Sequence, residues 1–207
     1  MNNLLTAQNL SVFRGNSLIF KNLDISINEG EAIHLLGDNG AGKTTLLQTL
    51  AGILIPDSGK IIKNCELLYL GHSLGIKLNL TVWENLKFAA ILYHNLNNIN
   101  KELDLAITSL GLEKYKNILV NELSAGQKRK VQLARLFFKD NKKLWLLDEP
   151  FNTLDIKTVE LLKNHLETHI KNKGAIILTT HQNFNMNNLK TLNLRELSTK
   201  GNHNDKF

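Results

Sequence analysis

Hydrophobic and polar positions along the chain change their spacing several times, and each change indicates a new kind of element. Before residue 37, SLIFKNLDISI alternates apolar and polar residues and EAIHLLG is a compact apolar run, both typical of strands. The next segment, KTTLLQTLAGIL, spaces its leucines as a helix does. GKIIKN and ELLYLG then predict two more strands. The first third of the chain therefore predicts strands that flank one helix.

The pattern becomes helical from about residue 80 to 139, in TVWENLKFAAILYH, KELDLAITSLGL and SAGQKRKVQLARLFF. The first and last of these segments open with Thr81 and Ser124, residue types that are preferred as N-caps. Strand character returns at KLWLLDE, a helix is predicted over 156–172, and AIILTT predicts a further strand. The polar tail from about residue 200 is expected to fray.

This order of elements predicts the fold class. Strands and helices alternate at both ends of the chain and are interrupted by a helical block, which favours an α/β core with a helical insertion. We expect a single domain over 1–207, in which 1–78 and 140–207 form the core and 79–139 form a helical subdomain. A chain of 207 residues is long enough to bury the core of such a domain.

Composition narrows the class of protein further. The chain is 43% hydrophobic and 21% charged, as expected for a soluble globular protein. Its net charge of +6 permits an anionic partner, but the basic residues are dispersed, so we expect no nucleic acid partner. A single cysteine, Cys65, excludes an internal disulfide and fits a reducing cytoplasm. We expect no signal peptide and no membrane-spanning segment, so attachment to a membrane would need another chain.

The segment GDNGAGKT matches the phosphate-loop pattern GxxxxGK[ST], and a strand before it and a helix after it complete the motif. Its glycines allow a tight turn in which backbone N–H groups and a helix N-terminus face phosphates. Lys43 is expected to reach the β- and γ-phosphates of ATP, and the Thr44 hydroxyl to bind Mg²⁺. The residues expected to contact the nucleotide here are Gly37, Asp38, Asn39, Gly40, Ala41, Gly42, Lys43, Thr44 and Thr45.

The segment LWLLDEP places four apolar residues directly before Asp148 and Glu149. A doubly wound fold presents its chemistry where buried strands end, at the carboxyl edge of the sheet. We expect Asp148 to hold Mg²⁺ through water and Glu149 to polarise the attacking water. An ordinary acidic strand end would explain this segment alone, but not its combination with a phosphate loop.

A third motif, LSAGQ from Leu123 to Gln127, stands directly before a basic helix. Phosphate loop, LSAGQ, LLDE and TTH follow one another as in ABC transporter ATPases, and the chain resembles that family over nearly its whole length. LSAGQ differs from the family's usual LSGGQ only at Ala125. The resemblance implies a RecA-like P-loop ATPase core of the ABC type. It also implies a homodimer in which Ser124, Gly126 and Gln127 contact the γ-phosphate held by the second subunit.

Three further positions take their expected roles from the resemblance. Asp155, at the end of EPFNTLD, matches the family's D-loop aspartate, which couples the two sites of the dimer. His181, in LTTHQ, matches the switch histidine that contacts the γ-phosphate. The family has an adenine-stacking aromatic where this chain has Arg14, so Phe13, one residue away, is the candidate for that contact.

His72, in LGHSLGIK, stands where the family has the glutamine of its Q-loop. That glutamine contacts Mg²⁺ or the attacking water, and its loop senses the membrane partner. Mg²⁺ prefers oxygen ligands, so an imidazole is a poor direct substitute, although a neutral one can hold a metal-bound water. His72 is therefore either a catalytic residue of this kind or a surface-loop histidine without a catalytic contact.

One branch of the family resembles this chain more closely. GHxxGIK followed by LT and ENL, together with LSAGQxRxVxLARL, LWxLDEPF and LTTHQ, is similar to the ATP-binding subunits of the cytochrome c maturation system, the heme exporter or CcmA family. The resemblance implies a peripheral subunit on the cytoplasmic face of the bacterial inner membrane. It also implies an integral membrane permease as partner, with ATP use tied to release of a heme-loaded chaperone.

Other interpretations of the motifs stay open. A soluble ABC ATPase of chromosome maintenance carries a long coiled coil before its signature motif, and one of translation carries two cassettes. A P-loop kinase explains neither LSAGQ nor His181, so a subunit of another ABC transporter is the main alternative.

His165 and His169 lie four apart on a predicted helix, but no third metal ligand is suggested, and we expect solvated side chains. Trp83 and Trp145 are expected to serve in packing.

Overall fold

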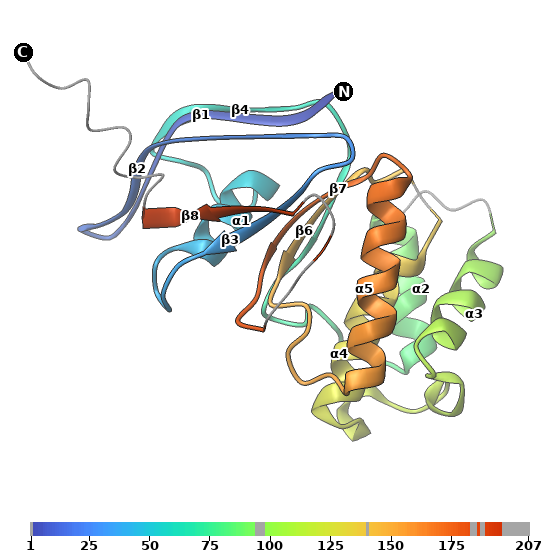
Figure 1. The fold of residues 1–207 in the computed structure, drawn as a ribbon. Coiled ribbons are helices and arrows are strands. Elements are labelled where there is room, and N and C mark those ends of the chain that lie inside the picture. Colours follow the sequence, from blue (N-terminus) through green and yellow to red (C-terminus); the bar gives the residue numbers. More distant parts are fainter. Residues whose placement is uncertain (1, 94–97, 140, 183–185, 187–188, 196–207) are drawn as a thin grey trace, which may run out of the picture. The chain divides into compact units, whose positions relative to one another are not determined.

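The computed structural model describes residues 2–93, 98–139, 141–182, 186 and 189–195, and Figure 1 shows their elements. The chain divides into two compact units. Unit 1 comprises Met1–His72, Lys142–Pro150 and Asn164–Phe207, and unit 2 comprises Ser73–Asn141 and Phe151–Lys163. Unit 2 thus takes in 151–163, which the sequence pattern assigns to the core. The tail after residue 200, for which fraying is expected, lies outside the described residues.

A three-stranded antiparallel sheet in unit 1 has the order β2-β1-β4. Its strands are β1 (Asn3–Arg14), β2 (Ser17–Asn28) and β4 (Ser58–Lys63). The alternation expected in β2 is confirmed, since Leu23, Ile25 and Ile27 are buried while Asp24 and Ser26 are exposed. One face of β2 therefore covers a core and the other meets solvent.

A five-stranded parallel sheet, also in unit 1, has the order β5-β6-β7-β3-β8. All residues of the neighbouring strands β6 and β7 are buried, which explains their continuous apolar runs. The edge strand β8 was not expected, because its sequence LKTLN carries polar, partly exposed side chains and no such run. The strands are β3 (Ala32–Leu36), β5 (Leu67–Leu70), β6 (Leu144–Asp148), β7 (Ala175–Thr179) and β8 (Leu189–Asn193).

The helix α1 (Lys43–Ala51) joins the two sheets of unit 1 through one hydrophobic core. Its buried leucines, Leu46, Leu47 and Leu50, belong to the same cluster as buried residues of both sheets. The helical spacing seen in the sequence thus places one face of α1 in the core, and the phosphate loop at its N-terminus is anchored by that packing. Such burial contributes about 1.5–3 kcal/mol for each leucine side chain.

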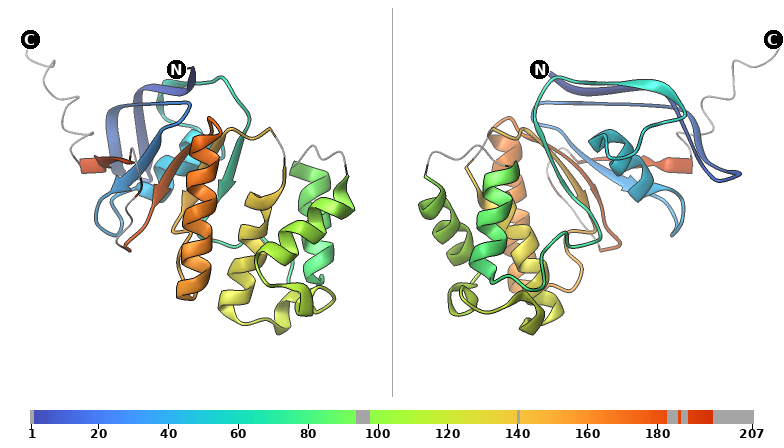
Figure 2. Two further views of the ribbon diagram at one scale, coloured as in Figure 1. Left: turned by 45° about the vertical axis from the view of Figure 1, so that its right-hand side comes forward. Right: turned by 180° about the vertical axis from the view of Figure 1, so that it is seen from behind.

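Unit 2 is mainly helical, and Figure 2 shows its helices α2, α3 and α4 grouped together. Both expected N-caps are confirmed: Thr81 and Glu84 bond to each other's backbone N–H, and Ser124 forms a capping box with Gln127. The helices are α2 (Val82–Tyr93), α3 (Ile99–Ser109), α4 (Ala125–Leu133) and three short 3₁₀ segments, Glu113–Tyr115, Val120–Glu122 and Ala134–Phe137. A further helix, α5 (Ile156–Lys171), begins in unit 2 and ends in unit 1.

The two histidines of α5 correct an expectation, because they are half-buried rather than solvated. The ring of His169 stacks on Trp145 with centroids 3.6 Å apart, and that of His165 lies 5.6 Å from the same ring. His169 Nε2 also lies 3.1 Å from the carbonyl oxygen of Lys143. A Cβ at Gly174 would collide with the His169 ring, so this stack depends on a glycine in the following turn. The packing role expected for Trp145 is confirmed.

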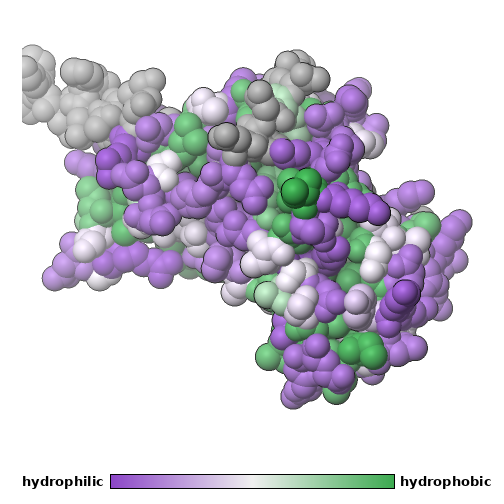
Figure 3. Space-filling view, turned by 60° about the horizontal axis from the view of Figure 1, so that its bottom comes forward, coloured by the Kyte–Doolittle hydropathy of each residue, from purple (hydrophilic) through white to green (hydrophobic). Residues whose placement is uncertain are grey.

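The surface offers little apolar area on the face shown in Figure 3, where hydrophobic residues form small, separate patches among hydrophilic ones. Within the described part of the chain, each helix is too short or too polar to span a bilayer.

Candidate functional site

The phosphate loop connects β3 to α1, and its glycines adopt conformations that other residues avoid. Gly37, Gly40 and Gly42 have φ angles of 149°, 82° and 96°. Gly42 is also the N-cap of α1, and a Cβ there would collide with the Ile19 side chain. Within the described structure no side chain caps this helix, so its first N–H groups can bind an anion.

Two cationic side chains lie at the phosphate loop. Lys43 begins α1, and its Nζ donates to the carbonyl oxygens of Gly37 at 2.6 Å and Asp38 at 3.1 Å. The guanidinium of Arg195, which follows β8, lies 2.6 Å from an Asp38 carboxylate oxygen. Sequence patterns give no signal for Arg195, because only the pairing of β8 with β3 brings it to the loop. Asp38 compensates the charge of Arg195, so Lys43 supplies the positive charge that favours a phosphate ligand.

Asp148 ends β6 and is held by two threonine hydroxyls. Thr44 Oγ1 donates to Asp148 Oδ2 and Thr179 Oγ1 donates to Asp148 Oδ1, each at 2.8 Å. Asp148 is 2% exposed, so these charge-assisted bonds compensate for the loss of its hydration. The phosphate loop and the ends of β6 and β7 are therefore joined at one carboxylate. Sequence reasoning missed Thr179, although two threonines directly before His181 were a signal.

Glu149 follows Asp148 in an unusual backbone conformation. Its φ of 50° is left-handed, which costs a non-glycine residue about 1–2 kcal/mol. Its backbone N–H donates to the Thr179 hydroxyl at 3.0 Å and reaches the Thr179 carbonyl oxygen at 3.2 Å, which holds this conformation. The carboxylate is buried, and its Oε1 lies 3.4 Å from His181 Nε2. Backbone strain of this kind is typical of functional sites.

Tyr69 lies in β5, on the opposite side of β6 from Thr179 in β7. Burial raises the pKa of its hydroxyl, and the negative charge of Asp148 raises that pKa further. A Cβ at Gly71 would lie 2.7 Å from the Tyr69 hydroxyl oxygen, so the backbone just before His72 packs closely against the Tyr69 ring. The carboxyl edge of the parallel sheet is therefore closely packed up to His72, where the first segment of unit 1 ends.

Phe13 lies near the end of β1, with 47% of its surface exposed, opposite Leu18 of β2. Its backbone N–H donates to Asp57 at 2.8 Å, which anchors the end of the strand. An exposed aromatic ring on an anchored hairpin can stack on a base. The neighbouring Arg14 reaches Gln48 of α1 at 3.4 Å.

In unit 2 the segment LSAGQ forms the N-terminus of α4. Ser124 Oγ accepts from the Gln127 N–H at 3.2 Å, and Gln127 Oε1 accepts from the Ser124 N–H at 2.8 Å. A Cβ at Gly126 would lie 2.8 Å from the Thr153 carbonyl oxygen. The close approach of Thr153 thus requires a glycine at position 126, whereas Ala125 already carries a Cβ.

Asp155 lies in the same part of unit 2 and caps the first turn of α5. It accepts hydrogen bonds from the N–H and hydroxyl of Thr158, each at 2.8 Å, and lies 3.0 Å from Lys130 Nζ. The Thr158 N–H, followed by Lys130 and the Thr158 hydroxyl, lowers the pKa of Asp155 to about 2. Asp155 therefore stays ionised over the physiological range.

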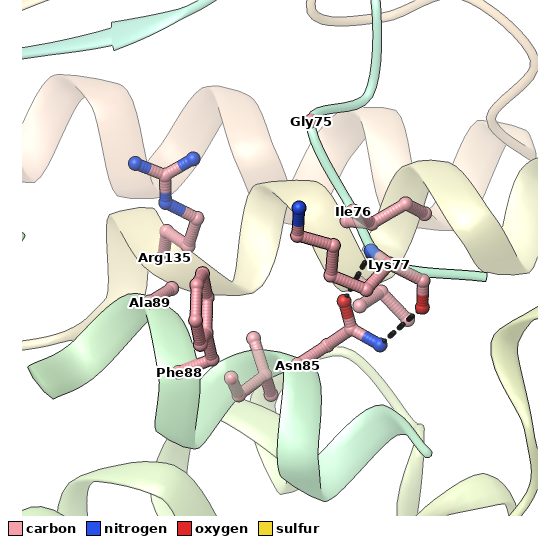
Figure 4. A pocket seen from close by; sticks show the side chains of 9 residues that line it. Gly75, Ile76, Lys77, Asn85, Phe88, Ala89 and Arg135 are labelled. Carbon is pink, nitrogen blue, oxygen red and sulfur yellow. Dashed lines mark hydrogen bonds between the residues drawn. The ribbon is translucent and has the colours of Figure 1, made fainter. Parts of the chain in front are cut away.

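Unit 2 also contains a cavity of about 270 Å³ beside α2, shown in Figure 4. Asn85 lies in its wall, where its Oδ1 accepts from the Lys77 N–H at 2.7 Å and its Nδ2 donates to the Lys77 carbonyl at 2.8 Å. Asn85 is 5% exposed and pins the loop that follows His72 to α2. His72 itself is exposed, and no hydrogen bond to another described residue is recorded for it.

The structure thus brings some of the expected site residues together. Within unit 1 the pairs Thr44–Asp148 and Glu149–His181 are joined through Thr179 into one cluster, and Lys43 directly precedes Thr44 in α1. Within unit 2 the N-terminus of α4 lies against the segment that ends in Asp155. Phe13 and His72 are exposed residues of unit 1.

Comparison with known proteins identifies the family. The ABC transporter family model matches residues 20–152. The cytochrome c biogenesis ATP-binding export protein CcmA of Aliivibrio fischeri is 38% identical over 93% of this chain and 100% of its own length. The protein of the same name from Escherichia coli K12 is 39% identical over 88% of this chain and 91% of its own. The chain belongs to the ABC transporter family.

Solved structures agree with this assignment. An ABC transporter ATP-binding protein from Pyrococcus furiosus has a TM-score of 0.77 and 28% identity, covering 94% of this chain and 98% of that one. An ATP-binding cassette solved as a dimer bound to ADP and Pi has a TM-score of 0.77 over 86% of this chain and 88% of its own. Its identity of 23% supports the fold alone. The α/β P-loop fold expected from the sequence is confirmed. This chain is an ATP-binding and ATP-hydrolysing subunit of the ABC type.

Proposed function

We propose that this ABC ATPase hydrolyses ATP for c-type cytochrome biogenesis, where it energises an integral membrane partner in heme delivery and release of the heme-loaded chaperone. The observation that carries the hydrolytic role is the cluster of Thr44, Asp148, Glu149 and His181 beside the phosphate loop. The names of the relatives, at 36–39% identity, support the process.

The phosphate loop binds the triphosphate of ATP in this proposal. Backbone N–H groups of the loop and the N-terminus of α1 surround the phosphates, and Lys43 leaves its loop carbonyls to contact the β- and γ-phosphates. Thr45, in the first turn of α1, adds a backbone and hydroxyl donor. Phe13 stacks on the adenine ring at the exposed end of β1.

The donors in unit 1 fit a Mg²⁺ ion. Thr44 Oγ1 and Asp148 Oδ2 are both hard oxygen donors, and their separation of 2.8 Å places them at the same point beside the phosphate loop. When bound, the metal neutralises phosphate charge. Thr44 would bind it directly and Asp148 through water, while Thr179 keeps the Asp148 carboxylate oriented.

Glu149 and His181 act on the attacking water and the γ-phosphate. Glu149 is held in a strained conformation with its carboxylate buried, so it orients the water and accepts its proton. His181, 3.4 Å from that carboxylate, donates to the γ-phosphate. His72 would hold a metal-bound water as a neutral imidazole and link this site to the membrane partner.

Two copies of the chain complete each site in this proposal. Ser124, Gly126 and Gln127 of one subunit contact the γ-phosphate held by the other, because a helix N-terminus with a serine hydroxyl is a good anion site. Asp155 couples the two sites. The dimer works peripherally on the cytoplasmic face of the bacterial inner membrane, against a permease of the cytochrome c maturation system.

Purification from the native membrane tests this function. We expect cytochrome c maturation components to co-purify with the chain; a lipid or metal permease instead would redirect the proposal to another ABC transporter. In the same complex, Glu149→Gln should retain ATP binding and lose turnover. Glu160 is an exposed carboxylate on α5, and Glu160→Gln, the control, should retain both ATP binding and turnover. Turnover at the parental rate in Glu149→Gln would show that another group is the base.

His72 needs a separate comparison. His72→Gln restores the family's residue and should keep Mg²⁺-dependent turnover with the partner present, while His72→Ala should lower it. Equal turnover in all three proteins would favour a surface histidine without a catalytic contact.

A further inference from the structure

His34 is a buried histidine that the proposed chemistry does not use. It lies in β3, is 7% exposed, and its Nε2 is 3.0 Å from the carbonyl oxygen of Thr180, 146 positions away in sequence. A carbonyl oxygen only accepts, so Nε2 carries the hydrogen and donates it. The bond therefore joins the strand that leads into the phosphate loop to the residue just before His181.

The register of the sheet explains why a side chain is needed at this point. The pairing of β3 with β7 ends at Leu35 and Thr179, because the chain turns away into the phosphate loop at Gly37. Thr180 lies one position beyond the last pair and is 7% exposed. Its carbonyl thus has no ladder partner from β3, and a buried carbonyl left unsatisfied is costly. The His34 ring supplies the donor instead.

This bond acts on a short segment with a functional end. The Thr180 hydroxyl accepts from the Gln182 N–H at 3.1 Å, so the backbone turns around His181 immediately after the anchored carbonyl. His181 Nε2 then lies 3.4 Å from Glu149 Oε1. His181 is exposed, with 57% of its side chain accessible, so its own packing restrains it little. Its position depends mainly on the backbone that carries it.

We propose that His34 is a positioning residue for the segment 180–182, and that its bond to the Thr180 carbonyl sets where His181 lies relative to Glu149. This inference rests on the role proposed above for His181. His34 contacts no reacting atom and is therefore not catalytic. The Nε2–H donor of the ring, and not a charge on the ring, is the feature that positions the Thr180 carbonyl.

Substitutions at His34 separate positioning from bulk packing. Glutamine carries a side-chain N–H donor at about the reach of Nε2, whereas leucine fills similar space without a donor. In the full chain with its membrane partner, His34→Leu should lower kcat roughly tenfold to a hundredfold, the scale of a misplaced catalytic group, with KM for MgATP nearly unchanged. His34→Gln should recover most of the loss. Ile27→Val, which removes a buried methyl group from β2, is the stability control and should leave kcat unchanged.

A spectroscopic measurement tests the bond without any activity. In ¹⁵N-labelled protein, the buried ring should give a slowly exchanging Nε2–H resonance that His34→Gln removes and His181→Ala retains. A ring with no protected Nε2–H would overturn the inference even if His34→Leu fails to fold.

The outcomes distinguish this inference from the function on which it rests. His181→Ala with parental turnover would remove the proposed role of His181 and the inference with it. If His181→Ala abolishes turnover while His34→Leu retains it, or while His34→Gln is as impaired as His34→Leu, only the inference fails. Loss in His34→Leu with recovery in His34→Gln supports it.

Discussion

At the scale of single residues, the site depends on threonine hydroxyls that hold the Asp148 carboxylate and the backbone of Glu149. Asp148 accepts from one hydroxyl on the phosphate loop and one at the end of β7. Thr179 makes two of these contacts, since its oxygen also accepts from the backbone N–H of Glu149. One hydroxyl therefore orients the carboxylate of the proposed metal site and the strained backbone of the proposed base.

Thr179→Val removes that hydroxyl while keeping the shape of the side chain. We expect it to destabilise the protein by about 1.5–3 kcal/mol, because a hydrogen bond to a buried charge is lost. Thr179→Val should also lower ATP turnover. Thr179→Ser keeps the hydroxyl and should therefore have nearly the parental stability and turnover. Thermal unfolding and steady-state ATPase assays measure the two effects. Thr168→Val, on the exposed side of α5, is the control and should change neither; equal effects of the two valine variants would contradict this role.

At the scale of elements, helix ends carry most of the expected chemistry in unit 2. The capping box of α4 and the Asp155 cap of α5 are both local arrangements within a few residues. They are connected by close approach, since Gly126 lies against Thr153 and Lys130 pairs with Asp155. LSAGQ and the segment that ends in Asp155 are therefore one packed structure.

Gly126→Ala tests that approach. The added Cβ would lie 2.8 Å from the Thr153 carbonyl oxygen, so the backbone of 151–155 or of α4 must shift. Overpacking of this kind costs about 1–3 kcal/mol, and it should also lower turnover by displacing Ser124. Calorimetry and ATPase assays measure both. Ala125→Gly, one position away at an exposed residue, should keep turnover. A Gly126→Ala protein with parental stability would show that the segment is loosely packed.

Asp155 gives a pH prediction with a definite sign. Its pKa is lowered from 3.8 to about 2, so the carboxylate contributes stability above its unfolded-state pKa, and that contribution is lost as the pH falls through about 2. The difference in unfolding midpoint between the parent and Asp155→Ala should therefore be constant from pH 7 to about pH 5 and shrink below pH 4. Thermal unfolding across this range measures it. A difference that stays constant at low pH would contradict the assignment.

At the scale of the whole molecule, the phosphate loop belongs to unit 1 and the signature segment to unit 2, and we propose that each works with its counterpart in a second copy. The arrangement follows from symmetry, because a two-fold dimer uses each surface twice. Such a dimer has two composite sites, and each depends on both chains.

Mixing two inactive chains tests the composite site. Lys43→Ala disables the phosphate loop, and Ser124→Asp keeps a helix cap but places a negative charge where the γ-phosphate is expected. Neither homodimer should hydrolyse ATP, but each mixed dimer contains one intact site. Random mixing should therefore restore about a quarter of the parental intact sites. Turnover of the mixture no higher than that of the separate variants would contradict a shared site.

The sequence by itself determined what is local. The phosphate loop, the carboxylates at the end of β6 and the caps of α2 and α4 each depend on residues a few positions apart, so their motifs were sufficient. The main strands were predicted because buried parallel strands are continuous apolar runs, whereas the polar edge strand β8 was not.

Tertiary structure decided which strand ends meet. Thr179 reaches Asp148 across 31 positions and His34 reaches Thr180 across 146, and both contacts follow from β7 lying between β6 and β3. In the same way, Trp145 became the stacking surface for His165 and His169, which no helical spacing predicts. Hydrogen bonds and ring contacts act over a few ångströms in space, so residues distant in sequence become partners only when the sheet sets their order.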